Sequence, residues 1–418
     1  MHRLIFICIF IFNIVFSNDE AYVLMVSFDG LRHDYIEKVS TPNFDKVKKN
    51  GVFSDGLVPV FPSLTFPNHY SIATGSYSGK HNITGNSFYD KFYNEKYDYR
   101  NKETVRNAKF YKSEPIWVTA ERQGLKTASY YWVGTEAPIK GYSPSIFKYY
   151  DGSVSFSSRI DSVISWFKLP ESNRPRLIML YFSEPDHTGH VDGASHVNVL
   201  NKVGEMDDLL GYLVEELKKL EIFSKLNIIL LSDHGMVDVD DDHLIILDDY
   251  VNDIENYNVY GQGAYVQIDR KDHQEFNYEK LHGEINQIPH CKYWSSHDIP
   301  KRFHFNNDNI GEFLILADEG WFITMESKYF EQTLLGRKKK GLPVSGMHGY
   351  DPYLSSMHGI FYAHGPKIKA GYTIPKFENI HIYPLICRLL GIVEYDNEID
   401  GPDGDIKVLE NILWDFDK

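Results

Sequence analysis

Four continuous apolar runs constrain the fold of this chain more than any other feature. They are rich in β-branched residues, show no polar–apolar alternation, and cover residues 21–30, 176–186, 226–236 and 359–366. Strands that are buried on both faces of a parallel sheet have this pattern. Helical patterns lie between the runs, and strands that alternate with helices predict an α/β fold. We therefore expect a doubly wound, mostly parallel sheet with helices on both faces.

Two of the intervening segments have clear helical features. In the stretch STPNFDKVKKNG, Thr41 stands at a capping position, Pro42 follows as the first helical residue, and Gly51 lies just past the end. Residues 197–220 carry apolar side chains at helical spacing. The segment 249–343 is less regular and rich in His, Asn, Tyr and Lys, so we predict an inserted subdomain or cap there.

The first 17 residues predict a secretory signal peptide. His2 and Arg3 precede an apolar run over residues 4–16, and small residues then suggest cleavage near Ser17. The run is short for a membrane span, so a signal peptide is favoured over a retained anchor. No later segment offers 18 uninterrupted apolar residues. We expect a secreted protein whose mature part, residues 18–418, forms one domain without a transmembrane anchor.

Secretion bears on two further features of the sequence. Asn82 begins an Asn-Ile-Thr sequon, which predicts a glycosylation site. Once the signal peptide has removed Cys8, Cys291 and Cys387 remain. They could pair in an oxidising compartment, or both could be free buried thiols, and the sequence leaves this open.

The net charge of −15 restricts the partners of this chain. A nucleic-acid backbone or an acidic membrane calls for a basic face, so neither is expected as the main partner. A small anionic substrate remains compatible, because bound metal ions reverse the sign of a local site.

Acidic residues and histidines follow three of the four apolar runs. In open α/β sheets, ligands bind outside the carboxyl ends of the strands, so three such ends in one sheet indicate a site. His348 lies between glycines, where the backbone can approach a metal closely. Mixed Asp and His ligands suit zinc, and two ions about 4 Å apart form a clamp for phosphoryl chemistry. The residues after the three runs are Asp29, Asp186 with His190, and Asp233 with His234.

Thr65 has two interpretations. It stands just before Phe66 and Pro67 and a short helical stretch, which predicts that its hydroxyl caps a helix. The same position places the hydroxyl beside free amides at the positive end of a helix, where a phosphate would bind. The sequence around Thr65 alone does not decide between a cap and a nucleophile.

A set of motifs resembles the ecto-nucleotide pyrophosphatase/phosphodiesterase family, which has the alkaline-phosphatase-like fold. The motifs span residues 26–366 in the order typical of that family. They are SFDGLR, FPSLTFPNHYSIATG, NITGN, WVGTE, YYDGSVSF, EPDHTGH, LSDHGM and GMHGYDPYLSSMHGIFYAHGP. The resemblance is to the compact members, which consist of a single phosphodiesterase catalytic domain.

The resemblance implies a role for each matching residue. Two zinc ions are implied, with Thr65 as both a metal ligand and the nucleophile that forms a covalent phosphodiester intermediate. Asn86 matches the residue that hydrogen-bonds a phosphate oxygen. Phe66 and Tyr150 match aromatic positions that sandwich a nucleobase. The implied ligands of one zinc are Asp186, His190 and His348, and those of the other are Asp29, Asp233, His234 and Thr65.

The implied activity is that of a secreted, metal-dependent nucleotide pyrophosphatase/phosphodiesterase. It would release nucleoside 5′-monophosphates from dinucleoside polyphosphates, NAD-like molecules or nucleoside triphosphates. One alternative is a choline-phosphodiester or lysophospholipid phosphodiesterase of the same family, because a choline pocket uses acidic and aromatic residues. A non-catalytic nucleotide-binding protein is a further alternative, against which the presence of Thr65 and Asn86 argues.

Overall fold

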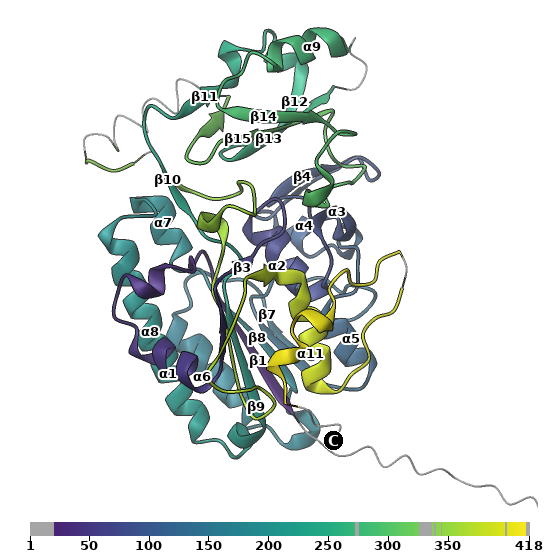
Figure 1. The fold of residues 1–418 in the computed structure, drawn as a ribbon. Helices are drawn as coiled ribbons and strands as arrows, with labels where there is room; N and C mark the ends of the chain where they lie inside the picture. Colours follow the sequence, from purple (N-terminus) through teal and green to yellow (C-terminus); the bar gives the residue numbers. More distant parts are fainter. Residues whose placement is uncertain are drawn as a thin grey trace, which may run out of the picture.

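The computed structural model describes residues 21–271, 276–325, 337, 340–343, 345–397 and 399–414. The predicted signal peptide, residues 1–17, lies outside these ranges. Among the helices described there, none is both long and apolar enough to cross a membrane. Figure 1 shows a large layered body below and a smaller sheet with α9 above it.

An eight-stranded sheet forms the centre of the larger body. Its strand order is β19-β2-β18-β9-β1-β8-β6-β7. The central strand β1 pairs in parallel with β8 and with β9, so that Val26 lies opposite both Leu180 and Leu230. The strands are β19 (Tyr372–Ile374), β2 (Val52–Ser54), β18 (Phe361–His364), β9 (Leu226–Leu231), β1 (Tyr22–Phe28), β8 (Leu177–Phe182), β6 (Thr127–Tyr130) and β7 (Ile146–Lys148).

One of the four apolar runs differs from the expected direction. Strand β18 runs antiparallel to β9, with Phe361 opposite Leu231, whereas the sequence pattern suggested a parallel strand. A strand buried on both faces is continuously apolar whichever way it runs, so the pattern carries no direction. The chain enters β18 from the edge of the sheet where β9 ends, and this connection sets the direction.

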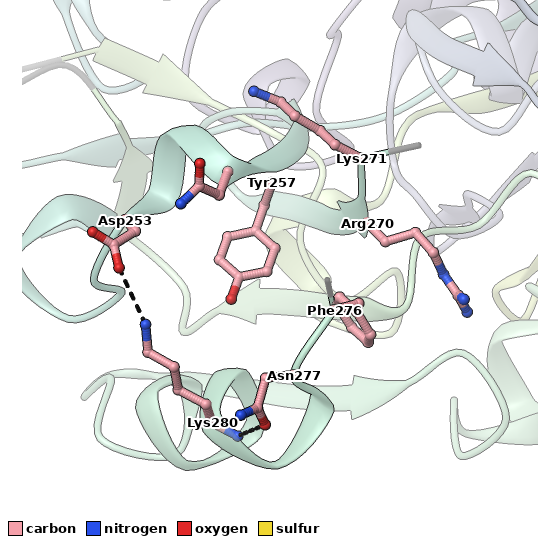
Figure 2. A pocket seen from close by; sticks show the side chains of 8 residues that line it. Asp253, Tyr257, Arg270, Lys271, Phe276, Asn277 and Lys280 are labelled. Atoms are coloured by element: carbon pink, nitrogen blue, oxygen red, sulfur yellow. Dashed lines mark hydrogen bonds and ion pairs between the residues drawn. The ribbon is translucent and has the colours of Figure 1, made fainter. Parts of the chain in front are cut away.

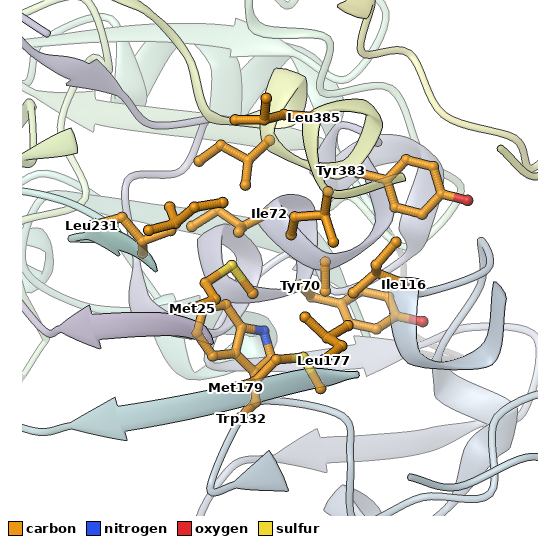
Figure 3. Packing of buried hydrophobic residues seen from close by; sticks show 14 of the residues in the cluster. Met25, Tyr70, Ile72, Ile116, Trp132, Leu177, Met179, Leu231, Tyr383 and Leu385 are labelled. Atoms are coloured by element: carbon orange, nitrogen blue, oxygen red, sulfur yellow. The ribbon is translucent and has the colours of Figure 1, made fainter. Parts of the chain in front are cut away.

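Helices cover both faces of this sheet, as predicted. Side chains of β1 alternate between two cores: Val23 and Met25 face one, and Leu24 and Val26 face the other. Figure 3 shows the first core, where Met25 and Met179 of the sheet pack against Ile72, Ile116 and Leu385 of three helices. The first core contains α2 (Thr65–Thr74), α5 (Ile116–Arg122) and α11 (Ile382–Leu390), and the second contains α1 (Pro42–Asn50), α6 (Phe156–Phe167) and α8 (Val197–Lys218).

The two helices expected from local features are present. Thr41 and Gly51 flank α1, which begins at Pro42. Helix α8 buries Val199, Val203, Leu210 and Leu217 on the face toward the sheet. A buried aliphatic side chain of this kind contributes about 1.5–3 kcal/mol to stability, so this face anchors the helix.

The segment predicted as an insertion contains a second sheet. This sheet is antiparallel with strand order β12-β13-β15-β14, and α9 (Tyr278–Ile285) packs on it through Leu281 and Ile285. Strand β10 (Val237–Val239) pairs with β17 (Ser345–Met347) where the chain leaves the large sheet and where it returns. The strands of the second sheet are β12 (Tyr257–Gly261), β13 (Tyr265–Arg270), β15 (Phe313–Ala317) and β14 (Cys291–Ser295).

Short elements complete the described fold. A hairpin of β4 and β5 follows Asn86, and the backbone N–H of Tyr99 after the hairpin donates to the Asn86 carbonyl at 3.0 Å. The remaining short elements are α3 (Ser78–His81), α4 (Lys102–Val105), α7 (Asp186–Asp192), β3 (Leu57–Val58), β4 (Ser87–Asp90), β5 (Glu95–Asp98), β11 (Leu244–Ile246), β16 (Phe322–Thr324) and β20 (Phe377–Glu378).

The structure answers the cysteine question. Cys291 lies in β14 of the second sheet and Cys387 in α11 beside the large sheet, and both are free thiols. Burial raises the pKa of the Cys291 thiol to about 12. The chain therefore relies on its cores for stability, without a disulfide between these two residues.

Asn82 has an environment that argues against the predicted glycosylation. Its side chain is fully buried. The amide nitrogen donates to Asp90 at 3.1 Å and to the Phe110 carbonyl at 3.0 Å, and the amide oxygen accepts from Asn309 at 3.0 Å. A glycan on this nitrogen would remove these bonds and would have no route to solvent. Asn82 thus links Asp90 of β4 to Asn309 of the inserted segment through buried hydrogen bonds.

Candidate active site at the carboxyl ends of the central strands

Two groups of possible metal ligands lie at the carboxyl ends of β1, β8 and β9. In each group one ligand atom per residue lies within 4.8 Å of the others. The two groups contain six of the seven metal ligands predicted from the sequence, and the seventh, Thr65, lies beside one of them. We call Asp29, Asp233 and His234 the first cluster, and Asp186, His190 and His348 the second cluster.

The first cluster comes from the loops that directly follow β1 and β9. The Nε2 atom of His234 lies 3.5 Å from Asp29 Oδ1 and 3.1 Å from Asp233 Oδ2. The Nδ1 atom of His234 donates to the carbonyl of Gly235 at 2.9 Å, which directs Nε2 toward the two carboxylates. The adjacent residues Asp233 and His234 thus face one common centre.

The second cluster combines a helix with a returning loop. Asp186 and His190 lie one turn apart in α7, and Gly189 between them is part of the helix. His190 Nε2 lies 3.1 Å from His348 Nε2, and both nitrogens lie 3.5 Å from Asp186 Oδ1. His348 arrives from the chain just after β17, far from α7 in the sequence.

The two clusters adjoin each other. The rings of His234 and His348 stack at a centroid distance of 3.6 Å and an angle of 15°. The backbone N–H of Asp186 donates to the Asp29 carbonyl at 3.0 Å, which joins the two loops directly. This arrangement is suited to two ions that act on one substrate group.

Three buried carboxylate oxygens in the clusters lack a hydrogen-bond donor among the described residues. They are Asp29 Oδ1, Asp186 Oδ1 and Asp233 Oδ2. Burying an unpaired charged oxygen is costly, and such atoms are normally paired or bound to a metal. The histidine nitrogens near them approach without hydrogen-bond geometry. The residues present therefore fit divalent cations with mixed Asp and His ligands.

The electrostatics of the clusters support the same conclusion. Burial raises the pKa of Asp29 well above its ordinary value, and the nearby charges of Asp233 and Asp186 raise it further. Burial acts in the same direction on Asp233, but His234 and His69 outweigh it and hold the pKa of Asp233 low. Repulsion among three close carboxylates is what a bound divalent cation would relieve.

Thr65 is the first residue of α2, and the residue at the N-cap position is Leu64. The predicted capping role is wrong, because no side-chain hydrogen bond caps this helix. The Thr65 hydroxyl instead lies 3.3 Å from His234 Nε2 in the first cluster. The hydroxyl lies at the positive end of the helix dipole, which favours an anion beside it.

Asn86 is connected directly to the Thr65 region. Its side-chain oxygen accepts a hydrogen bond from the backbone N–H of Phe66 at 2.9 Å. Within the described part of the chain, its NH₂ group has no acceptor, so it is available to a ligand oxygen. The structure therefore brings Asn86 and Thr65 to the same end of α2.

Phe66 belongs to α2, and Tyr150 lies in the loop after β7. Phe66 packs at a centroid distance of 5.6 Å from Tyr99, and Tyr150 lies 5.0 Å from Tyr131 with half of its surface exposed. Burial raises the pKa of Tyr150, Arg159 lowers it, and the charge of Asp29 adds to the rise. The phenol is therefore within electrostatic reach of the first cluster.

Three residues that the sequence analysis did not single out lie behind the first cluster. The hydroxyl of Tyr181 donates to Asp29 Oδ2 at 2.5 Å. His69 bonds the Thr65 carbonyl at 2.9 Å and the Ser27 hydroxyl at 2.8 Å. Signals for them exist in the sequence: Ser27 and Tyr181 interrupt apolar runs near the ends of strands, and His69 follows Thr65 by one helical turn.

Two other regions are candidate sites, and each has fewer of the features expected of an active site. Asp240, Asp242 and His243 form a third group of possible ligands, but the two carboxylates are exposed to solvent. A hollow of about 370 Å³ beside α9 is lined by residues shown in Figure 2, including Arg270 and Lys280. Those two cations already pair with Glu312 and Asp253. We therefore place the candidate active site at the first and second clusters.

Comparisons with known proteins identify relatives that match nearly the whole chain. The profile of the family described as Type I phosphodiesterase / nucleotide pyrophosphatase matches residues 23–351. Human ectonucleotide pyrophosphatase/phosphodiesterase family member 1 is 37% identical over 401 residues, which cover 94% of this chain and 42% of the human protein. A venom phosphodiesterase from Naja atra is 35% identical over 399 residues, which cover 94% of this chain and 46% of the venom protein. The chain thus spans less than half the length of these curated relatives.

Solved structures are similar over the whole fold. Murine ectonucleotide pyrophosphatase/phosphodiesterase 5 superposes with a TM-score of 0.85 at 30% identity, covering 94% of this chain and 100% of that chain. A structure of an inactive threonine-to-alanine variant of the murine protein, in complex with AMP, matches with the same values. The similarity confirms the predicted alkaline-phosphatase-like α/β fold.

Proposed function

Because this chain belongs to the type I phosphodiesterase/nucleotide pyrophosphatase family of hydrolases, we propose that it hydrolyses phosphodiester or pyrophosphate bonds of nucleotides and releases nucleoside 5′-monophosphates. One observation carries the proposal: the Thr65 hydroxyl lies 3.3 Å from His234 Nε2, at the point where the two ligand clusters adjoin. Unpartnered buried oxygens in both clusters support their use as metal sites.

The proposed cofactors are two zinc ions, one in each cluster. The mixed Asp and His donor set and its buried, unpartnered oxygens fit this assignment. When bound, such ions supply charge neutralisation at the phosphate and lower the pKa of oxygens that contact them. Thr65 would contribute its hydroxyl oxygen to the first cluster.

The chain's own residues would perform the remaining tasks. The Thr65 oxygen attacks phosphorus, and the leaving group departs as a covalent phosphodiester forms on Thr65. The NH₂ group of Asn86 donates to a phosphate oxygen, where negative charge accumulates in the transition state. The positive end of the α2 dipole favours the same negatively charged group. Hydrolysis of the threonine ester then releases the nucleoside monophosphate and restores Thr65.

The proposed specificity for nucleotides depends on aromatic stacking. Phe66 adjoins Thr65, and Tyr150 is half exposed near the first cluster. Each ring that stacks on a base contributes about 1–3 kcal/mol, and any base can stack. The AMP complex of the murine relative supports a nucleoside monophosphate as the bound product. The substrate classes we propose are dinucleoside polyphosphates, NAD-like molecules and nucleoside triphosphates.

The proposed location is extracellular. The ecto and venom descriptions of the relatives support it, together with the signal peptide predicted for residues 1–17. Detection of the processed chain in the medium of expressing cells tests this part of the proposal.

The activity is tested with three chromogenic esters: a nucleotide 5′-ester, a phosphocholine ester and a phosphate monoester. We expect turnover of the nucleotide ester, its loss on chelation, and a decrease of roughly 10³-fold or more in Thr65→Ala. Thr65→Ser, which retains a hydroxyl, should keep part of the activity. Thr373→Ala, at an exposed position in β19, is the matched control and should resemble the wild type.

The other outcomes would contradict the proposal in distinct ways. Preferred turnover of the phosphocholine ester would identify a choline-phosphodiesterase of the same family. Metal-dependent binding of AMP without turnover of any ester would identify a nucleotide-binding protein.

A further inference from the structure

We propose that Tyr181 and His69 are positioning residues that set the affinity of the first cluster for a divalent cation. Tyr181 holds the Asp29 carboxylate by a hydrogen bond, and His69, which is hydrogen-bonded to the Thr65 carbonyl, stands against the Asp233 carboxylate. The inference rests on the proposed function, because it concerns the same metal site. It extends that function to residues that are outside both clusters and that would not contact the substrate.

Tyr181 holds Asp29. The phenol lies at the end of β8, next to β1 in the sheet, and its hydroxyl donates to Asp29 Oδ2 at 2.5 Å. The other oxygen of Asp29, Oδ1, is buried and has no hydrogen-bond partner among the described residues. The carboxylate is therefore fixed by one oxygen while the other faces the cluster. A carboxylate held in this way can bind a cation without first losing rotational freedom.

His69 connects the nucleophile's helix to Asp233. Its ring is fully buried, and Nδ1 lies 2.9 Å from the Thr65 carbonyl and 3.3 Å from Asp233 Oδ2. Both of these oxygens can only accept, so Nδ1 carries the proton. The Nε2 atom is then the acceptor for the Ser27 hydroxyl at 2.8 Å in the neutral ring. Ser27, two residues before Asp29 in the chain, thus fixes the tautomer that directs a proton toward Thr65 and Asp233.

Aromatic packing holds these two residues together. The His69 ring makes edge contacts with Trp132 at 5.0 Å and with Tyr181 at 5.2 Å. The indole N–H of Trp132 donates to the His69 carbonyl at 3.0 Å. His69 and Tyr181 therefore form one packed unit beneath the first cluster, and a change in either affects the other.

In the second cluster, backbone carbonyls hold the Nδ1 atoms of both histidines. His190 Nδ1 lies 2.7 Å from the Gly346 carbonyl, and His348 Nδ1 lies 2.9 Å from the Ser63 carbonyl. These are backbone contacts, which side-chain substitution does not remove. Substitutions at Tyr181 or His69 should therefore weaken one metal site and leave the other unchanged, and this selectivity distinguishes positioning from general destabilisation.

The test measures zinc retained by the intact chain at graded free-zinc concentrations, without substrate. Tyr181→Phe removes only the hydroxyl, and His69→Leu removes the ring nitrogens. In both variants we expect one of two zinc ions per chain to bind about 10–100-fold more weakly, with the second unchanged. His69→Asn keeps an N–H near the position of Nδ1 and should restore much of the affinity.

Tyr70→Phe is the matched control. Tyr70 is a fully buried tyrosine on α2 that belongs to neither cluster, and its hydroxyl bonds the Lys112 carbonyl at 3.0 Å. It should lose a similar hydrogen bond and retain both zinc ions with wild-type affinity. The effect of Tyr181→Phe on turnover at saturating zinc should be in kcat, with KM unchanged, because the substrate does not touch this residue.

Three outcomes overturn the inference: wild-type zinc affinity in both Tyr181→Phe and His69→Leu, equal weakening in Tyr70→Phe, or a wild-type chain that binds no zinc. Failure of the proposed function is recognised separately. A wild-type chain that binds two zinc ions, shows the selective loss in these variants, and hydrolyses none of the esters would refute the function while the positioning role holds.

Discussion

Acidification should destabilise this protein through His81, a fully buried histidine beneath the helix that carries Thr65. Its Nε2 lies 3.2 Å from the Pro67 carbonyl, which can only accept, and its Nδ1 accepts from the backbone N–H of Ile83 at 3.2 Å. Both ring nitrogens are therefore engaged in the neutral form. Burial lowers the pKa of His81 from 6.5 to about 3.

The sign and size of the effect follow from this shift. A pKa that is depressed in the folded state means that the unfolded chain binds the proton first as pH falls. The contribution of His81 to stability is thus fully present above pH 6.5 and is lost between pH 6.5 and about 3. Each pH unit inside that window costs about 1.4 kcal/mol, so a change from about pH 7 to about pH 5 should remove about 2 kcal/mol.

The measurement is urea unfolding at both pH values for the wild type and for His81→Gln, a variant that cannot titrate at this position. Other titrating groups act on both proteins and cancel in the difference. The stability advantage of the wild type over the variant should shrink by about 2 kcal/mol at the lower pH. His297→Gln, at an exposed histidine, is the control. A difference that is the same at both pH values would refute the reasoning.

Three further predictions concern the candidate site. Asn86→Ala should lower kcat about 10²–10³-fold with a smaller change in KM, measured with the nucleotide ester, because its donor acts on developing charge. Tyr150→Ala should raise KM by the loss of one stacking contact, about 5–150-fold for 1–3 kcal/mol, and should spare turnover of a small diester without a base. Gly346→Ala should cost about 1–3 kcal/mol in urea unfolding and should weaken zinc retention, because a Cβ there would meet the Gly189 carbonyl and lie 2.5 Å from Met236 Sδ. Gly204→Ala, in α8 with no atom within 4 Å of the added Cβ, should instead be neutral or stabilising by up to about 1 kcal/mol.

Much of the fold was predictable because segments that are buried in the core are made of apolar residues, which can be recognised in the sequence. The runs that became β1, β8 and β9 are apolar at nearly every position, with Ser27 and Asn227 as exceptions, since both faces of each strand are covered. Both ends of helix α1 could be predicted to the residue, because proline favours the first position of a helix and glycine favours the position just after its end. Direction was not predictable for β18, because the same burial gives the same pattern in either orientation.

Local context does not reveal the partners of two residues, Thr65 and Asn82. A threonine before a short helix resembles a cap, but the helix begins at Thr65 itself and leaves the hydroxyl free for His234. Asn82 begins a complete sequon, but its amide nitrogen donates buried hydrogen bonds to Asp90 and to the Phe110 carbonyl. In both cases the chemistry of the residue depends on partners that are distant in the chain, which a local motif does not contain.

The sequence by itself determined which residue types are present at the ends of the strands, and therefore that Asp and His ligands could gather at one edge of the sheet. Only the tertiary structure decided how they meet. Parallel pairing places Asp29 beside Asp233, and the return of the chain from the second sheet brings His348 to His190. The supporting residues Tyr181 and His69 are likewise recognisable only in the fold, because hydrogen-bond geometry depends on positions in space, and these are set by packing across the whole chain.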